Sequence, residues 1–375
     1  MSKPDIYCFY PNIEIVKGYS RSVVFDIFKC SYFFLPKRLA NFFAEKRSFS
    51  IGDLIEICDG DDNAIDLIEY FKRKQIISSS FSTELFECEK RKYDFPGVIS
   101  NAIVEINKIY KSNYPKLFQE ISDLGCHSIE LRFIDFSNEL LNFIFENLNS
   151  TKISSYNVFV PIIKETKAIV HWFESNQKLL NLVMLSNNGS SMIPQLFYEK
   201  LQSKAFILDN SIDGLNDICG KLFHPINTNS FHFLESKSFN NCLNKKVCVD
   251  FNGRIKNCLA FSKEFGDAFN DLRIVVNSHL FQAKWDLTKD EIDVCKSCEF
   301  RYLCKDCRAN IKHIENIFSQ PAKCTYNPYI AKWQGEDGYV PVEECGTYSR
   351  ETGFVVNHKR VAELNELLWE EQQIK

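Results

Sequence analysis

The sequence predicts an α/β protein with a small N-terminal module, a central β/α region and a cysteine-rich C-terminal region. Three observations carry this prediction. Three aromatic and β-branched runs are followed by three short helix-like segments over residues 1–80. Strand-like and helix-like segments alternate over 96–238, which favours parallel β/α units. Eight of the fifteen cysteines lie within 239–335, and a peripheral C-terminal extension, which includes the charged helix VAELNELLWEEQQ, is predicted over 336–375.

The N-terminal module is predicted to contain three strands and three helices. The runs IYCFY, RSVVFDIF and SYFFL are rich in residues that favour strands. Pro36 is tolerated in the first turn of a helix, and KRLANFFAEKR follows it with helical spacing of its apolar residues. Ser50 is a suitable N-cap for a second helix, and a third ends at Lys74. This composition predicts a winged-helix-like module, followed by a linker over 78–95.

The central region is predicted to contain six strands, separated in several places by helices. The helix-like segments include YPKLFQEISDLG, NELLNFIFENLN and KETKAIVHWFESNQ. Their alternation with strands predicts either a partial β/α barrel or an open sheet, and six strands fit an incomplete barrel better than a complete one of eight. The predicted strands are 102–106, 128–134, 156–162, 179–185, 204–209 and 230–235.

Composition and charge exclude several classes of partner. The net charge of −4 and the pI near 6.0 give no electrostatic signature of nucleic-acid binding. No apolar run approaches the roughly 20 residues that span a bilayer. The N-terminal residues also lack the pattern of a signal peptide. We therefore expect a cytoplasmic protein without nucleic-acid or membrane partners, in which clustered cysteines indicate metal binding rather than disulfides.

The C-terminal cysteines have the spacing of metal ligands. Three interpretations remain open: a zinc site, disulfides, or two iron–sulfur clusters. The two CxxC pairs in CKSCEFRYLCKDC are separated by only five residues, which is short for an all-cysteine zinc site, and four cysteines would be left over. Two [4Fe–4S] clusters need eight thiolates. The candidates are Cys242, Cys248, Cys258, Cys295, Cys298, Cys304, Cys307 and Cys324.

A predicted hairpin supports a shared site for two of these cysteines. The segment VCVDFNGRIKNC contains Asn252-Gly253, a strong signal for a two-residue turn. Such a turn would bring Cys248 and Cys258 close together across the strand pair. Within the later run, Arg301, Lys305 and Arg308 are candidates for hydrogen bonds to a cluster, or equally for a solvated basic face.

This cysteine pattern resembles the SPASM domain, the C-terminal extension of many radical SAM peptide-modifying enzymes. Four residues separate Gly253 from the third cysteine, Cys258, as in that family. One departure is the spacing of two residues, rather than three, between Cys304 and Cys307. The resemblance implies a first [4Fe–4S] cluster on Cys242, Cys248, Cys258 and Cys307. It implies a second [4Fe–4S] cluster on Cys295, Cys298, Cys304 and Cys324.

The chain also resembles the grasp-with-spasm peptide maturases over most of its length. KGYSRS, YDFPGVISNAIVEI, CEFRYLCKDCRA and CTYNPYIAKW are similar to blocks of that family. The CxxxCxxC motif that holds the radical-generating cluster is absent. The resemblance therefore implies a degenerate radical-SAM-like barrel, and the missing motif argues against S-adenosylmethionine as a cofactor.

The implied function is peptide maturation. The partners would be an ATP-grasp ligase and a ribosomally made precursor peptide, whose leader would add as a strand to the N-terminal module. The clusters would position the peptide or transfer electrons. If the chain is an enzyme, it would be a peptide-modifying oxidoreductase and not a conventional radical SAM enzyme. The alternative is a zinc-stabilised, cysteine-rich peptide-binding scaffold without redox chemistry.

Overall fold

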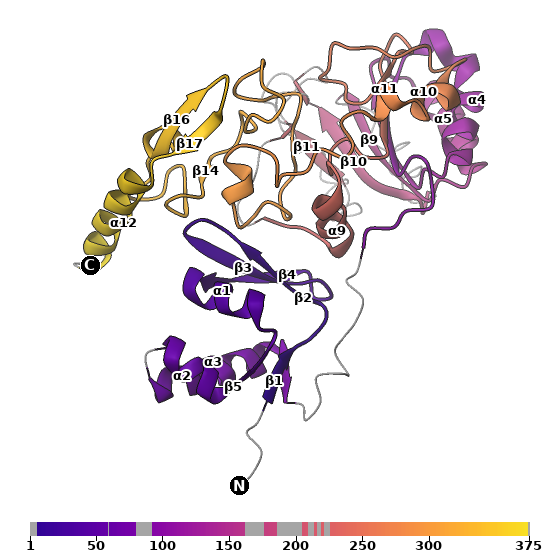
Figure 1. Cartoon of the computed structure of the whole chain (residues 1–375). Helices are drawn as coiled ribbons and strands as arrows, with labels where there is room; N and C mark the ends of the chain where they lie inside the picture. The colour runs from indigo at the N-terminus through magenta and orange to yellow at the C-terminus, as the bar shows by residue number, and fades with distance from the viewer. Residues whose placement is uncertain are drawn as a thin grey trace. The chain divides into compact units, whose positions relative to one another are not determined.

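The computed structural model describes residues 6–58, 60–79, 92–161, 176–185, 205–208, 214–215, 219–220 and 226–373. The chain divides into two compact units whose segments alternate along the sequence (Figure 1). Unit 1 consists of Met1–Tyr93, Gly220–Asn241 and Leu287–Lys375, and unit 2 of Asp94–Cys219 and Cys242–Asp286. None of the helices within the described ranges has the length and apolar character needed to cross a membrane.

The N-terminal part of unit 1 contains two small antiparallel sheets and three helices. One sheet has the order β5-β1-β6 and the other β2-β3-β4. The three predicted strands and three predicted helices are confirmed, whereas β2, β5 and β6 were not predicted. The winged-helix assignment stays a prediction. The elements are β1 Ile6–Phe9, β2 Ile13–Lys17, β3 Arg21–Asp26, β4 Ser31–Pro36, α1 Lys37–Glu45, β5 Ser48–Ser50, α2 Ile51–Cys58, α3 Asp61–Lys74 and β6 Ile77–Ser79.

Strand β3 is buried on both faces because its side chains enter two different cores. Val24 packs in a core made only of N-terminal residues, together with Phe43 and Phe71. Val23 and Phe25 point to the opposite face, because successive side chains of a strand alternate. They pack in a second core with residues from later in the chain, and the Phe25 ring stacks on Phe233 at 4.5 Å between centroids.

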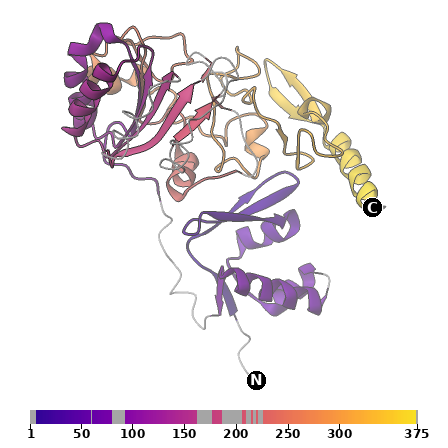
Figure 2. The same ribbon diagram turned by 180° about the vertical axis from the view of Figure 1, so that it is seen from behind.

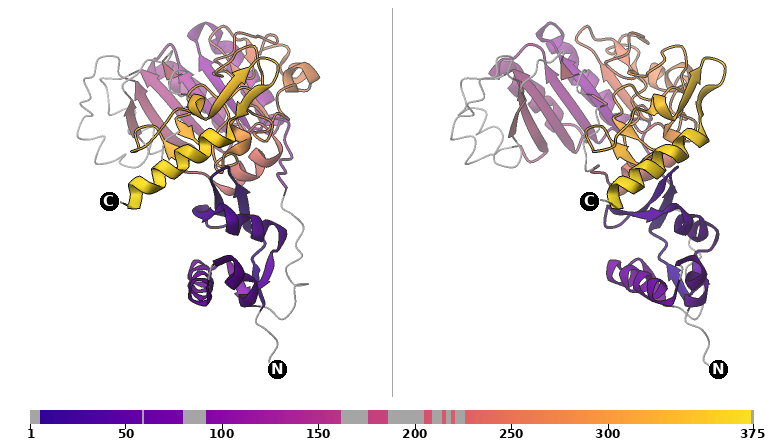
Figure 3. Two further views of the ribbon diagram at one scale, coloured as in Figure 1. Left: turned by 60° about the vertical axis from the view of Figure 1, so that its left-hand side comes forward. Right: turned by 90° about the vertical axis from the view of Figure 1, so that its left-hand side faces the viewer.

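The remaining segments of unit 1 contain little regular structure. They comprise α9 Ser230–Ser238, the 3₁₀ turn η3 Cys295–Ser297, β14 Tyr326–Asn327, β15 Lys332–Trp333, the turn η4 Val342–Cys345, β16 Gly346–Ser349, β17 Gly353–Val356 and α12 His358–Gln373. The β16–β17 hairpin and α12 lie at the C-terminal end of the chain (Figure 3). The helix predicted in the C-terminal extension is confirmed as α12.

The strand predicted at 230–235 is wrong, because this segment forms α9. The Asn229 side chain accepts a hydrogen bond from the His232 backbone N–H at 2.8 Å and so caps a helix. Phe233 is buried while Phe231 is 44% exposed. An alternating apolar pattern this short does not distinguish a strand from a helix, and here the cap decides.

Unit 2 is built on a seven-stranded sheet of order β11-β10-β9-β8-β7-β12-β13 (Figures 1 and 2). All neighbouring pairs are parallel except β12 and β13. The α/β class is therefore confirmed, and within the described strands the sheet is open. The strands are β7 Asn101–Ile106, β8 Ser128–Phe133, β9 Ser155–Pro161, β10 Leu179–Leu185, β11 Ala205–Leu208, β12 Lys246–Val249 and β13 Ile255–Lys256.

One face of this sheet is covered by helices. Helices α4 Tyr114–Asp123 and α5 Asn138–Asn149 contribute Phe118, Ile144 and other apolar side chains to a core shared with the strands (Figure 1). The short helices α10 Leu272–Val276 and α11 His279–Gln282 add to the same core. Helices between parallel strands are the usual way to bury such a face. The third predicted helix, KETKAIVHWFESNQ, lies almost entirely outside the described residues.

The predicted two-residue turn at Asn252-Gly253 is wrong. Strands β12 and β13 do form an antiparallel hairpin, but the Asp250 N–H donates to the Arg254 carbonyl at 3.1 Å, leaving three residues in the turn. Gly253 takes a positive φ of 73°, the position that a three-residue turn reserves for glycine. The Asp250 carboxylate accepts from the Asn252 and Arg254 N–H groups and fixes this longer turn.

Candidate functional site

Four of the eight predicted cysteine ligands line one small cavity in unit 1. Its volume is about 20 Å³. The four are Cys295, Cys298, Cys304 and Cys324, the set implied for the second cluster. Phe300, Tyr326 and Trp333 complete an apolar and aromatic wall.

Tight backbone turns bring the first three of these cysteines together. The Cys298 N–H donates to the Cys295 carbonyl at 2.9 Å across η3. The Cys304 N–H donates to the Phe300 carbonyl at 3.0 Å, which closes a further turn. Cys324 arrives from a separate loop just before β14. Local sequence therefore positions three thiols, and the chain fold adds the fourth.

Burial raises the pKa of three of these thiols, those of Cys295, Cys298 and Cys324. Burial, followed by the neighbouring Cys324 and Cys304, raises the pKa of Cys295 well above its usual value. Burial also raises the pKa of Cys298, with Glu299 and then Cys304 as the next causes. A metal that binds thiolates must displace these protons, which makes its affinity depend on pH.

A buried lysine beside the thiols was not predicted from the sequence. The Lys289 side chain is 3% exposed, and its ammonium donates to the Cys304 carbonyl. Burial lowers the pKa of Lys289, but the nearby Cys304, Asp306 and Cys295 outweigh this, so the pKa is raised. The site thus contains a fixed positive charge that favours thiolates. No motif pointed to it, because it lies before the cysteine run.

Of the three basic residues in the cysteine run, only Arg301 lines the cavity. Its guanidinium is paired with Asp290 at 2.7 Å and donates to the Cys298 carbonyl at 3.1 Å. Arg308 is buried in an ion pair with Asp306 at 2.6 Å. Lys305 is exposed. Arg301 and Arg308 therefore form ion pairs with side chains of the structure and do not contribute to a solvated basic face.

The other predicted ligands are divided between the two units. Cys242, Cys248 and Cys258 belong to unit 2 and Cys307 to unit 1, so the first cluster set stays a prediction. Burial, and next the neighbouring Cys258, raises the pKa of Cys248, so the hairpin does place these two thiols within electrostatic range. Cys307 is buried and accepts a hydrogen bond from the Asn310 side chain at 3.6 Å.

The face of the unit 2 sheet opposite α4 and α5 carries a row of mostly polar side chains that the sequence analysis missed. The register places Cys248, Ile103, Glu130, Asn157 and Asn181 side by side across β12, β7, β8, β9 and β10. The Asn181 amide donates to Asn157 at 2.7 Å.

An ion pair extends this row. Glu130 pairs with Arg132 at 2.7 Å, and both charges act on the Cys248 thiol. The signal was available in the sequence, because charged residues at alternate positions of a buried parallel strand are unusual.

A buried carboxylate adjoins the thiol-lined cavity. The side chain of Glu299 is fully buried, accepts a hydrogen bond from the Tyr326 hydroxyl, and pairs with the Arg21 Nε at 2.7 Å. Burial raises the pKa of Glu299, and the hydrogen bonds from Tyr326 and Arg21 oppose that rise. The ion pair joins β3 to the cysteine loop within unit 1.

The chemistry of this donor set fits a thiolate-binding metal. Four cysteine sulfurs without competing carboxylates among the lining residues suit zinc or an iron–sulfur cluster. Within the described ranges, no three His, Cys, Asp or Glu side chains stand in coordinating geometry, and the fourteen described cysteines form no disulfide. The site is therefore a group of neighbouring thiols that metal binding would draw together.

Comparison with known proteins gives few matches. No protein-family model and no curated protein matches the chain. Among solved structures it is similar to SuiB of Streptococcus suis. The match to SuiB bound to S-adenosylmethionine has 12% identity, covers 80% of this chain and 96% of SuiB, and has a TM-score of 0.37. The match to SuiB bound to its precursor peptide SuiA has 10% identity, covers 81% and 96%, and has a TM-score of 0.29.

TM-scores this low assign neither a fold nor a function to this chain. The prediction against S-adenosylmethionine gains no support from them either.

Proposed function

We propose that this chain is an iron–sulfur protein of peptide maturation, which acts with an ATP-grasp ligase on a ribosomally made precursor peptide. The grouping of Cys295, Cys298, Cys304 and Cys324 around one cavity carries the proposal. Their spacing is the part of the sequence that most resembles a SPASM domain. The second cluster would bind there, and the first on Cys242, Cys248, Cys258 and Cys307.

The chain's own residues would tune such a cluster rather than react with substrate. A cluster held by four thiolates has no open iron position, which leaves electron transfer, peptide positioning or structural support. Lys289 supplies a buried positive charge beside Cys304 and Cys295, and this favours the more reduced, more negative state of the centre. Phe300 and Trp333 keep the cavity apolar.

Peptide binding would use the free edge of β4. In the described part of the chain β4 pairs with β3 alone, so its outer backbone groups have no strand partner. An extended leader peptide would pair there as an added strand. If the chain modifies the peptide, the absence of CxxxCxxC implies an oxidoreductase that is not a conventional radical SAM enzyme.

Metal analysis of anaerobically purified protein tests the cofactor. We expect a brown protein with about eight irons per chain, as two cubane clusters require. Cys304→Ser should remove about half of the iron, since each cluster carries four. Cys30→Ser changes an exposed cysteine away from the cavity and should leave the iron content unchanged. A colourless protein without iron would contradict the proposal.

A zinc-stabilised scaffold is a second candidate, favoured by the size of the cavity. A volume of about 20 Å³ is close to that of one water-sized group. This suits a single tetrahedral ion better than a four-iron cubane. One tightly bound zinc per chain, lost in Cys304→Ser, would establish this candidate in place of the clusters.

A search of the neighbouring genes for a short peptide and an ATP-grasp ligase comes first, and activity is then tested with their products in the presence of ATP. We expect the peptide to bind the full chain and to change mass only when both proteins are present with a reductant. An unchanged mass in every condition would remove the catalytic role. Absence of binding would remove the recognition role as well.

A further inference from the structure

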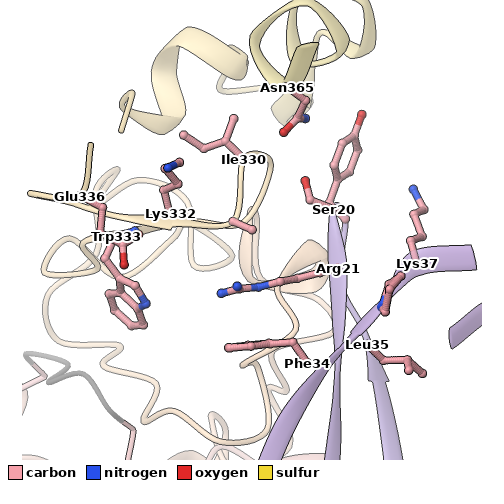
Figure 4. A pocket seen from close by; sticks show the side chains of 13 residues that line it. Ser20, Arg21, Phe34, Leu35, Lys37, Ile330, Lys332, Trp333, Glu336 and Asn365 are labelled. Atoms are coloured by element: carbon pink, nitrogen blue, oxygen red, sulfur yellow. The ribbon is translucent and has the colours of Figure 1, made fainter. Parts of the chain in front are cut away.

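A second, larger cavity in unit 1 is lined in part by residues of β4. Its volume is about 850 Å³, within the range of sites that hold extended organic ligands. One side is formed by Phe34, Leu35 and Pro36 of β4 with Lys37 of α1, and the other by Lys332, Trp333 and their neighbours (Figure 4). The cavity therefore combines the N-terminal module with the C-terminal segment of the same unit.

The charged groups around this cavity leave two lysines without a carboxylate partner. Arg21 is already neutralised by Glu299, and its guanidinium lies flat on the Phe34 ring at 3.6 Å. The Lys37 ammonium lies over the Tyr19 ring at 4.9 Å, and Lys332 donates to a backbone carbonyl at 2.7 Å. Neither lysine forms an ion pair within the described ranges.

The one acidic side chain in the lining is held on the wall. Glu336 accepts a hydrogen bond from the Trp333 backbone N–H at 2.8 Å. Two unpaired ammonium groups against this one carboxylate give the cavity a net preference for anions. In Figure 4, Lys37 and Lys332 come from opposite sides of the cavity, with Arg21 and Phe34 between them.

We propose that this cavity binds an extended acidic peptide segment, with Lys37 and Lys332 contacting its carboxylates and Phe34 and Trp333 packing its apolar side chains. The proposal rests on the peptide-binding role proposed above and deepens it. The backbone of such a segment would pair with the free edge of β4, and its side chains would alternate between the aromatic wall and the lysines. The peptide site is therefore composite, and the N-terminal module supplies only part of it.

Selection from a library of short random peptides on the immobilised full chain tests the chemistry. We expect enrichment of Asp or Glu alternating with apolar residues. Fluorescence anisotropy then gives the affinity of a labelled enriched peptide. Lys37→Glu and Lys332→Glu should each weaken it about five- to tenfold, as expected for reversing one partly exposed charge. Added salt should weaken wild-type binding.

Two controls make the result specific. Lys152→Glu reverses an exposed lysine of unit 2 that does not line the cavity, and it should leave the affinity unchanged. Lys332→Gln removes the charge without introducing repulsion and should give an intermediate loss. Circular dichroism confirms that each variant is folded, and helix α1 should tolerate Glu at its first position.

The following outcomes overturn the inference. They are enrichment of no peptide or of peptides without acidic residues, an unchanged affinity in Lys332→Glu, or an equal loss in Lys152→Glu. Failure of the proposed function gives a different pattern. In that case acidic peptides bind, and their affinity falls in Lys37→Glu and Lys332→Glu. A precursor peptide encoded beside the gene, in contrast, neither binds nor changes mass.

Discussion

Glu299 is the residue whose environment depends most on distant parts of the chain. Its carboxylate is fully buried next to Cys298, and its cationic partner Arg21 stands 278 positions earlier. Such a pair adds little stability when complete, because desolvation offsets the attraction, but removing one partner is costly.

Removing the cation should therefore destabilise unit 1 strongly. We expect Arg21→Met to lower the free energy of unfolding by about 3–5 kcal/mol, because it leaves a buried carboxylate unpaired. Burial raises the pKa of Glu299, so the folded state holds its proton more tightly than the unfolded state. Both proteins, wild type and Arg21→Met, should therefore lose stability as the pH rises above 4.5, the ordinary value for this group, and the difference between them should widen above the raised pKa that Glu299 has beside Arg21. Urea unfolding at several pH values measures both effects.

A double variant separates the ion pair from packing. Arg21→Met combined with Glu299→Gln should recover most of the lost stability, because the buried charge is gone. Arg273→Met changes an exposed arginine and should have almost no effect. If the double variant is as unstable as Arg21→Met alone, the loss comes from the packing of Arg21 on Phe34 and not from its charge.

Among individual residues, the cysteines around the cavity could be predicted from the sequence, whereas the charged residues next to them could not. The spacing of Cys295, Cys298 and Cys304 is local information, and turns of a few residues bring these thiols together. Lys289 lies in no motif, and although Arg21 and Glu299 fall within the KGYSRS and CEFRYLCKDCRA blocks, only the folded chain shows that they form an ion pair. Likewise, only the folded chain shows that the proposed partners of Cys307 come from the other unit.

Among the elements, α2 shows how a local signal fixes a helix end. The Ser50 hydroxyl accepts from the Asp53 N–H at 3.3 Å, and the Asp53 carboxylate accepts from the Ser50 N–H at 2.7 Å. This reciprocal pair satisfies two backbone N–H groups that the first helical turn leaves open. Ser50 was predicted as the cap because serine is a preferred N-cap residue, whereas its reciprocal pairing with Asp53 was not predicted.

Removing the carboxylate should destabilise α2 measurably. We expect Asp53→Ala to cost about 1 kcal/mol near neutral pH, the usual value of a lost cap. The hydrogen bond from Lys46 lowers the pKa of Asp53, so this contribution exists above pH 3.8 and disappears as the pH falls below it. Thermal unfolding at both pH values measures the difference. Asp66→Ala, at an exposed position of α3, should show no comparable pH dependence.

The elements also show where local signals fail. The strand β10 was predicted at its observed bounds, since a long apolar run in an α/β repeat has few alternatives. The segment at 230–235 has aromatic residues at alternate positions, yet the cap at Asn229 makes it a helix. The turn at Asp250 was misjudged because its carboxylate competes for backbone N–H groups that a shorter turn would leave free.

At the scale of the whole molecule, unit 1 depends on the C-terminal extension. Val361 and Leu364 of α12 pack in a core with Tyr329, Ile330 and Val294, and the last of these precedes Cys295 directly. This extension was predicted as a separate peripheral segment, and its share in the core was not visible from composition.

Deleting residues 336–375 should therefore damage the thiol-lined site as well as the C-terminus. We expect the truncated chain to unfold at a lower temperature and to bind less than half of the metal found in the full chain, because the packing behind Cys295 is lost. Metal analysis and calorimetry measure the two effects. Removing only the last two residues is the control. Full metal content in the longer deletion would show that the site forms without this core.

The position of β3 between two cores has a consequence for synthesis on the ribosome. Val24 of β3 can be buried as soon as the first 77 residues have left the ribosome, because the N-terminal core that contains it is complete by then. Val23 and Phe25 must wait for Phe233, Phe300 and Trp333. For most of translation the nascent chain therefore presents an apolar sheet face to the solvent, and this face is a ready binding site for a chaperone or for a second unfinished copy.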